Sequence, residues 1–274
     1  MMRRLLAVAT VLALAALGLV AESGCQSLTG MDELGLVWSD EFDGPAGQSP
    51  GSTRWTFDVG TDWGNAQLEY DTARPVNVSL DGQGHLAITA LEEDYLGCDY
   101  TSGRINTRNR FARTRGRFEA RIKLPVGQGI WPAFWLLGAN IGSVGWPSCG
   151  EIDIMEYRGQ YPSVATGALH GPGYSGGNSL GGQYTLASAS FNDDYHVFAI
   201  DWDSSSIDWS VDDQVYMTLG PSDLPPGTSW VFNSDFFIIL NVAVGGNYVG
   251  APDATTVFPQ TMLVDYVRVY GTIS

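Results

Sequence analysis

The chain has 274 residues and a formal net charge of −16, with 30 acidic side chains against 14 lysines and arginines. This balance excludes nucleic acid and other polyanions as partners, because those partners require a basic surface. A neutral substrate is compatible with the charge, and so is a role in solubility alone. The length allows one large all-β domain or two small ones.

The N-terminus has the pattern of an export signal. Arg3 and Arg4 precede an uncharged apolar run that begins at Leu5. The run only marginally reaches the length that a bilayer requires, so a retained membrane anchor is the weaker alternative. We interpret residues 1–24 as a signal peptide and residues 25–36 as a short linker, which predicts a secreted, cell-surface or periplasmic protein.

Two cleavage patterns compete at the end of this signal. Ser23 and Gly24 precede Cys25 as in a lipobox, which predicts lipidation of Cys25 and membrane contact through that anchor alone. A lipobox prefers Leu where this chain has Glu22, and Ala21-Glu22-Ser23 also suits ordinary signal peptidase. Both alternatives stay open at this point.

Period-two alternation dominates the rest of the chain, most clearly at 117–124, where apolar and charged residues take opposite faces. Further strands are expected at 86–91, 196–202, 236–244 and 262–270, with a hairpin formed by 207–211 and 215–219. The glycine-rich stretch 171–182 is interpreted as a surface loop. Without helical spacing or a linker, residues 37–274 predict one antiparallel sandwich or barrel.

Cys98 and Cys149 are the cysteines that remain once Cys25 is assigned to the signal region. In an oxidising compartment such a pair predicts a disulfide. Because Cys149 lies two residues before Glu151, the bridge would brace the strand that carries the candidate acids.

Three carboxylates lie within six residues, at Glu151, Asp153 and Glu156, with apolar residues between them. In a regular strand Glu151 and Asp153 share a face, whereas Glu156 points the opposite way. A bulge near Met155 would absorb one residue and bring all three carboxylates to one face. A solvated edge strand is the alternative, but it does not account for the extra residue.

Paired carboxylates at close range suit glycoside hydrolysis, and their separation decides between retention and inversion of configuration. At about 5.5 Å two such charges repel by about 3 kcal/mol at an effective dielectric of 20, so one should keep its proton near neutrality. This division supplies an ionised nucleophile beside a protonated acid. Asp153 can hydrogen-bond to either partner.

Aromatic residues concentrate upstream of the acids, at Trp131, Trp135 and Trp146. Indole faces stack on sugar rings, although tryptophan is also common in sandwich cores. We assign Trp38 and Trp55 to the core. His170 could lie on the strand next to the one that carries the acids and donate a hydrogen bond in the cleft, although a lone histidine is more often a structural residue. No zinc spacing, catalytic serine order or nucleotide motif occurs in the sequence.

The segment Glu151-Ile152-Asp153-Ile154-Met155-Glu156 resembles the E-x-D-x-x-E signature of family 16 glycoside hydrolases, in the bulged form that laminarinases show. The resemblance runs from about Val37 to Tyr270. Further blocks in family order are Trp38–Phe42, Tyr100–Arg104, Gly129–Trp135, Asn241–Gly246 and Val264–Tyr270.

This resemblance implies a β-jelly roll of two curved antiparallel sheets with an open substrate cleft. It implies an endo-acting retaining hydrolase of β-1,3-glucan, with Glu151 as nucleophile, Asp153 as assistant and Glu156 as acid/base. Catalysis needs no cofactor, and we expect a monomer. The positions that would contact sugar are Asn65, Arg104, Trp131, Trp135, Trp146 and His170.

The resemblance also implies a structural calcium away from the cleft, at Glu41, the backbone of Gly84 and Asp265. Oxygen ligands of this kind suit calcium.

Two rival functions stay open. The first is a family 16 hydrolase of another polysaccharide, namely mixed-linkage β-glucan, agarose or carrageenan. The second is a non-catalytic β-glucan-binding module, which the presence of all three carboxylates disfavours.

Overall fold

Strands dominate residues 35–272, which are the residues that the computed structural model describes. β1 (Gly35–Asp40) begins two residues before the predicted domain start at Val37, because Gly35 already pairs with Gly271. The predicted signal peptide and Cys25 lie outside the described residues. Within them, no helix has the length and apolar character needed to span a membrane.

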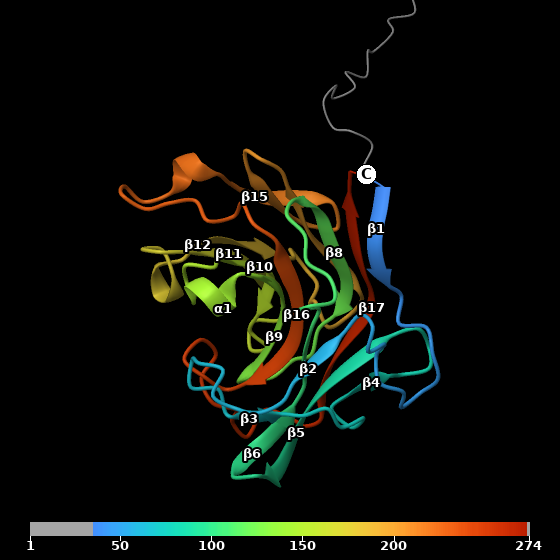
Figure 1. The fold of residues 1–274 in the computed structure, drawn as a ribbon. Coiled ribbons are helices and arrows are strands. Elements are labelled where there is room, and N and C mark those ends of the chain that lie inside the picture. The colour runs from blue at the N-terminus through green and yellow to red at the C-terminus, as the bar shows by residue number, and fades with distance from the viewer. Residues whose placement is uncertain (1–34, 273–274) are drawn as a thin grey trace, which may run out of the picture. The chain divides into compact units, whose positions relative to one another are not determined.

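The strands of this part of the chain form two sheets, of ten and seven strands (Figure 1). The ten-stranded sheet contains β1, β3 (Glu69–Asp71), β4 (Val78–Leu80), β5 (Leu86–Tyr95), β6 (Cys98–Ser102), β8 (Gly116–Lys123), β13 (His196–Trp202), β14 (Ile207–Val211), β15 (Gln214–Leu219) and β17 (Gln260–Gly271). The seven-stranded sheet has the order β12 (Leu180–Thr185), β11 (Val164–His170), β10 (Glu151–Tyr157), β9 (Ile130–Gly138), β16 (Phe236–Val244), β7 (Arg104–Asn106) and β2 (Thr56–Asp58). All pairings are antiparallel in the described part of the chain, apart from β3 with β6.

The alternation in the sequence decides which face of each strand is buried. In β8, Phe118 and Ile122 enter the core, while Arg117 and Arg121 stay partly exposed on the other face. β16 is buried at every position because it lies in the middle of its sheet, between β9 and β7. The predicted strands and the hairpin are therefore confirmed.

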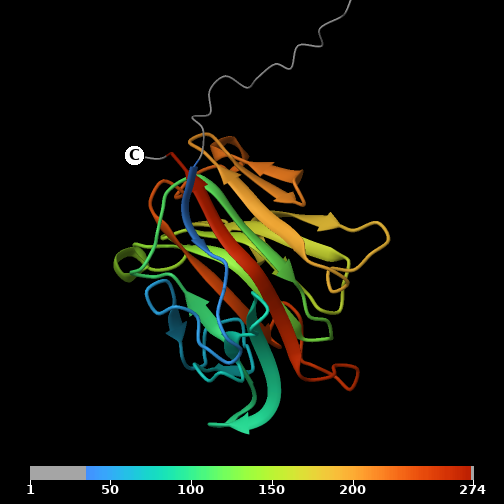
Figure 2. The ribbon, with the colours of Figure 1, turned by 90° about the vertical axis from the view of Figure 1, so that its right-hand side faces the viewer.

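The core lies between the two sheets, and Figure 2 is turned so that β1 and β17 of the ten-stranded sheet face the viewer. It joins Phe118 of the ten-stranded sheet to Ile152 and Met155 of the seven-stranded sheet in one apolar cluster. Trp55 belongs to this core, as predicted, while Trp38 is half-buried and stacks on Phe111 with ring centroids 5.1 Å apart.

Short helical turns occupy loops of residues 35–272: α1 (Ile141–Val144), η1 (Gly176–Asn178) and η2 (Pro221–Asp223). The predicted surface loop 171–182 contains η1, but its end is the start of β12, which the sequence analysis missed. A Cβ on Gly182 would lie 2.9 Å from Met217 Sδ, so this glycine serves close packing within a strand.

The predicted disulfide is wrong in this structure, where Cys98 and Cys149 are both free. Cys98 begins β6 and its sulfur lies 3.9 Å from Thr61 Oγ1, while Cys149 is buried against Leu137 and Phe237. The two thiols therefore lie in different surroundings, and they form no bond with each other that could brace β10.

Candidate active site

A bulge in β10 brings three carboxyl side chains to one face of the seven-stranded sheet. Toward β9, Asp153 and Met155 face consecutive residues, so Ile154 is the extra residue. Toward β11 the register shifts between Asp153 and Glu156. Ile154 and Met155 both point into the core, which leaves Glu151, Asp153 and Glu156 on the opposite face. The predicted bulge near Met155 is confirmed.

Two indole N–H groups hold the outer carboxylates of this triad. Trp146 donates from Nε1 to Glu151 Oε2 at 3.0 Å, and Trp131 donates from Nε1 to Glu156 Oε1 at 3.0 Å. Trp131 is 8% exposed, whereas Trp146 is 48% exposed and presents its ring to solvent beside the acids. Both tryptophans therefore lie beside the acids, and their contact with sugar stays a prediction.

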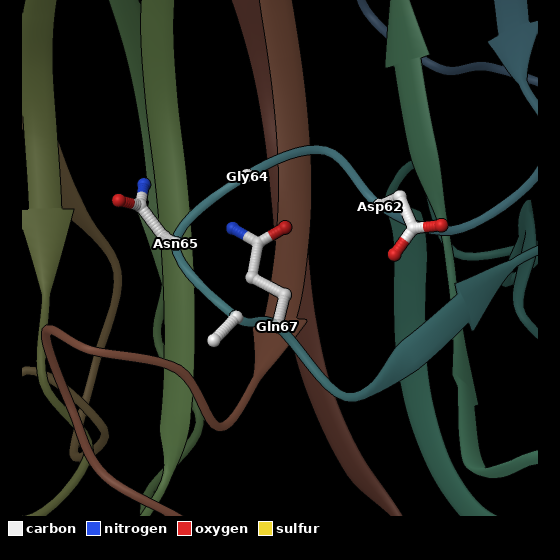
Figure 3. A pocket seen from close by; sticks show the side chains of 5 residues that line it. Asp62, Gly64, Asn65 and Gln67 are labelled. Carbon is white, nitrogen blue, oxygen red and sulfur yellow. The ribbon is translucent and has the colours of Figure 1, made fainter.

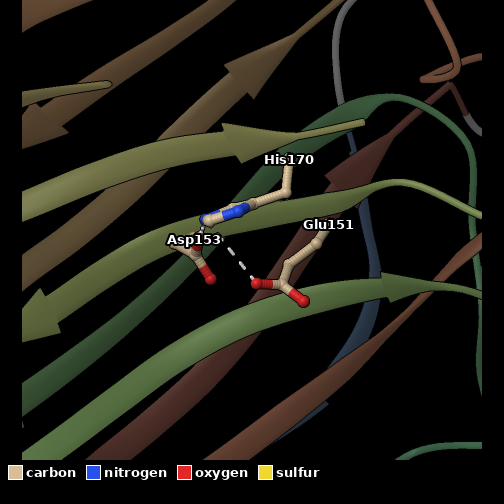
Figure 4. Close-up of side chains that lie close together, drawn as sticks. All are labelled: Glu151, Asp153 and His170. Carbon is tan, nitrogen blue, oxygen red and sulfur yellow. Dashed lines mark ion pairs between the residues drawn. The ribbon is translucent and has the colours of Figure 1, made fainter. Parts of the chain in front are cut away.

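His170 of β11 faces Asp153 and Glu151 (Figure 4). Its Nε2 lies 3.0 Å from Asp153 Oδ2 and 3.7 Å from Glu151 Oε1. The backbone N–H of Gly176 donates to His170 Nδ1 at 3.0 Å, so Nδ1 is an acceptor and Nε2 carries the ring proton. The histidine therefore turns an N–H toward the carboxyl pair.

Burial raises the pKa of all three carboxyls of the triad to about 8. Repulsion from Asp153 adds to the rise of the pKa at Glu151 and Glu156, while the indole donors and His170 oppose it. The groups therefore lose their protons as a coupled set, so that part of the set stays protonated near neutrality. The sequence analysis expected one of the two glutamates to keep its proton, and the raised pKa of Asp153 adds a third group to this set.

Glu151, Asp153 and His170 also form the one group in the described part of the chain that could ligate a metal, with donor atoms within 4.8 Å of one another. Two of its members have other partners, since Glu151 accepts from Trp146 and His170 Nδ1 accepts from Gly176. The arrangement suits acid–base chemistry among the side chains themselves.

The side chains of the expected calcium ligands do not fit that ion as they are arranged. Both oxygens of Glu41 accept hydrogen bonds from Arg268, at 3.0 and 2.7 Å, and Asp265 pairs with Arg121 Nη1 at 2.5 Å. Each carboxylate already has a cationic partner. Calcium at Glu41, Gly84 and Asp265 would therefore have to displace two arginines.

A second cluster lies on β7 and β9, further along the same sheet. The Arg104 guanidinium lies 4.9 Å from the ring centres of both Trp63 and Trp135, and its Nε pairs with Asp58 Oδ2 at 3.0 Å. Trp135 donates from Nε1 to Asn241 Oδ1 at 2.8 Å. Arg104 and Trp135, both predicted to contact sugar, thus form one platform of rings and hydrogen-bonding groups.

Asn65 lies in the loop between β2 and β3, two residues after Trp63. The pocket in Figure 3 is lined by Asp62, Gly64, Asn65, Ala66 and Gln67. Asn65 has a φ of 56° and its backbone oxygen accepts from the N–H of Asn247 at 2.7 Å, which ties the loop to the end of β16. Its side chain is exposed and is available to a ligand.

Sequence analysis missed Tyr248 and Arg158 beside Glu156. Tyr248 packs on Trp131 with ring centroids 5.1 Å apart, and its hydroxyl lies 3.0 Å from Thr166 Oγ1. The Arg158 guanidinium lies 5.0 Å from the Tyr248 ring centre. Only the position of Arg158 two residues after Glu156 pointed to the site.

Sequence analysis also missed Glu69 and Asp71, which are 1% exposed behind Arg104. Burial raises the pKa of Glu69 to about 7 and raises the pKa of Asp71 well above its usual value, while Arg104 opposes both shifts. The sequence pattern of β3 is too short to have signalled this buried pair.

Comparisons of sequence and of structure both find glycoside hydrolases that are similar to this chain. The family model for glycosyl hydrolases family 16 matches residues 57–266. A β-glucanase of Rhodothermus marinus is 42% identical over 248 residues, which cover 86% of this chain and 84% of that protein. The laminarinase catalytic domain of Thermotoga maritima MSB8 is 46% identical, with a TM-score of 0.83, covering 89% of this chain and 100% of the domain. SCLam, a non-specific endo-β-1,3(4)-glucanase, is 34% identical with a TM-score of 0.78, covering 88% of this chain and 92% of that one. The likeness in fold confirms the predicted β-jelly roll.

Proposed function

We propose that this chain, which belongs to glycosyl hydrolase family 16 and is a glycoside hydrolase, cuts β-1,3-glucan internally and retains the anomeric configuration. The observation that carries the mechanism is the bulge at Ile154, which gathers three buried carboxyls on one face. Laminarinases and β-glucanases among the relatives support the substrate.

The proposed reaction begins with Glu151 as a carboxylate and Glu156 as a carboxylic acid. Glu156 protonates the glycosidic oxygen while Glu151 attacks the anomeric carbon, which forms a glycosyl–enzyme ester and releases the leaving sugar chain. Glu156, now ionised, then takes a proton from water, which attacks the anomeric carbon and frees Glu151. Asp153 and the Nε2–H of His170 face Glu151 during both steps.

One contact favours ionisation of Glu151 over Glu156. Each carboxyl accepts from an indole N–H, but Glu151 also lies 3.7 Å from the Nε2 atom of His170, which carries the ring proton. A further donor stabilises a carboxylate. Glu156 lies beside the buried Trp131 ring, on which the half-buried Tyr248 ring packs, and is assigned the role of the acid.

Retention has its own test. Proton NMR of the first product released from laminarin should show the β-anomer, because a double displacement restores the starting configuration. Initial release of the α-anomer would establish inversion and remove Glu151 as nucleophile.

A substrate panel tests the β-1,3-glucan preference. We expect reducing sugar to be released from laminarin much faster than from lichenan, agarose or carrageenan. Equal or faster release from a galactan would overturn the assignment, and comparable rates on lichenan would favour a broad β-glucanase. Glu151→Ala should lose turnover and keep measurable glucan binding, whereas a wild type that binds without cleavage would favour the binding module.

We also propose that the chain acts outside the cytoplasm, on the basis of Arg3, Arg4 and the apolar run that follows them. Mass spectrometry of the mature N-terminus distinguishes the two cleavage alternatives. A diacylglyceryl adduct on Cys25 would identify a lipoprotein, and an unmodified N-terminus would identify ordinary secretion.

A further inference from the structure

Trp209 of β14 reaches from the opposite sheet to the catalytic strand. Its ring is fully buried, and its Nε1–H donates to the backbone oxygen of Asp153 at 2.8 Å. Asp153 is the last residue of β10 that pairs in register before the bulge. The indole therefore satisfies a buried carbonyl at the point where the strand departs from regular geometry.

Gly167 makes room for this contact. It lies on β11 between Thr166 and Ala168, whose partners on β10 flank the bulge. A Cβ on Gly167 would lie 2.5 Å from Trp209 Cδ1 and 2.7 Å from its Nε1. A side chain at this position would displace the indole, so the bulge, the glycine opposite it and the tryptophan form one packed unit.

We propose that Trp209 is a positioning residue for the carboxyl triad, because its N–H holds the backbone of Asp153 in the bulged conformation that turns Glu156 toward the face of Glu151. The inference rests on the proposed hydrolysis and adds a residue from outside the site. In a regular strand Glu156 would return to the core side, and the acid would leave the substrate face.

The chain provides two matched controls for a Trp→Phe substitution. Trp55 is 2% exposed and donates from Nε1 to Asp40 Oδ2 at 2.8 Å, away from β10. Trp202 is 3% exposed and its Nε1 has no hydrogen-bond partner. Trp55→Phe thus loses an indole hydrogen bond elsewhere, and Trp202→Phe loses only ring volume.

The test measures kcat and KM on laminarin for all three variants. We expect Trp209→Phe to lower kcat about ten- to a hundredfold, the scale of a misplaced catalytic group, with KM little changed. Trp55→Phe and Trp202→Phe should keep the wild-type kcat even where they lower the melting temperature. Wild-type kcat in Trp209→Phe, or an equal loss in Trp55→Phe, overturns the proposal.

A second variant covers a failure of Trp209→Phe to fold. Site-specific replacement of Trp209 by benzothienylalanine keeps the ring shape and removes the N–H, and the same loss of kcat is expected. Wild-type kcat in that protein overturns the proposal.

A measurement that needs no substrate distinguishes a failure of the positioning role from a failure of the proposed function. If the wild type cleaves no polysaccharide of the panel, the carboxyl titrations of Asp153 and Glu156 are followed by carbon-13 NMR. Trp209→Phe should move both titrations and Trp55→Phe should move neither. Unchanged titrations in Trp209→Phe overturn the positioning role.

Discussion

Replacement of Glu151 by Gln is expected to stabilise the fold at neutral and alkaline pH while it abolishes hydrolysis. The amide keeps the shape of the side chain and still offers an oxygen to the N–H of Trp146, which donates to Glu151 at 3.0 Å. The substitution removes the negative charge of Glu151 and with it the repulsion from Asp153. One oxygen of Glu151 and one oxygen of Asp153 lie no more than 4.8 Å apart.

The magnitude follows from that distance and from the pKa. Two carboxylates about 4.8 Å apart repel by about 3 kcal/mol at an effective dielectric of 20. Burial raises the pKa of Glu151 to about 8, so the folded state binds this proton more tightly than the unfolded chain. The stabilising contribution is complete below the unfolded pKa of about 4.3 and is lost as pH rises through about 8. The amide of the Glu151→Gln variant does not titrate, so the advantage of that variant grows over the same window.

Urea unfolding at pH 4, 6 and 8 measures this difference. We expect little difference at pH 4 and an advantage of about 3 kcal/mol at pH 8, equivalent to about 6–12 °C in melting temperature for a domain of this size. Glu92→Gln is the control, because it removes the same charge from an exposed position on β5. The reasoning fails if Glu151→Gln is no more stable than wild type at pH 8, or if its advantage does not grow with pH.

Four further outcomes are expected. Trp131→Phe removes the donor that lowers the pKa of Glu156, so the alkaline limb of the pH–rate profile should move to higher pH, with kcat reduced about tenfold. Arg104→Lys should raise KM about tenfold with kcat less affected, because an ammonium cannot lie flat between two indole rings; an unchanged KM would contradict the platform. A thiol reagent should label Cys98 and Cys149 in the unfolded protein without prior reduction, whereas absence of labelling would restore the disulfide. Chelation of calcium should leave the melting temperature unchanged, because the expected ligands are paired with arginine, and a clear decrease would restore the calcium site.

The parts of the site that depend on local sequence could be predicted. The spacing of Glu151, Asp153 and Glu156 is inconsistent with strict alternation, so a bulge followed from counting residues alone, and the structure contains it. Strands with clear alternation were also predictable, because period two assigns one face to the core. Trp146 was placed beside the acids because only a short turn separates it from β10.

Contacts between distant segments could not be predicted in the same way. Arg104 and Trp135 meet because β7 and β9 both pair with β16, an order that no local pattern specifies. For the same reason Cys98 and Cys149 could be matched only as the remaining pair, and the sheet order places them apart. The contact of Trp209 with Asp153 crosses the whole core between two sheets.

The two buried carboxyl clusters show why burial alone does not make a catalytic site. Glu69 and Asp71 are 1% exposed, and Glu69 accepts the backbone N–H of Val244 at 2.8 Å, so no substrate can reach them. Glu151 combines a raised pKa with an 18% exposed side chain, so its proton can be exchanged with a ligand. The inner pair still contributes to the response to pH, because burial raises the pKa of Glu69 to about 7. Glu69→Gln should therefore remove part of the wild-type loss of stability between about pH 4 and pH 7, the window between the unfolded and folded pKa of this buried glutamate, while Glu151, Asp153 and Glu156 keep their share of that loss. A pH dependence of stability equal to that of the wild type would contradict the charge state inferred for the inner pair.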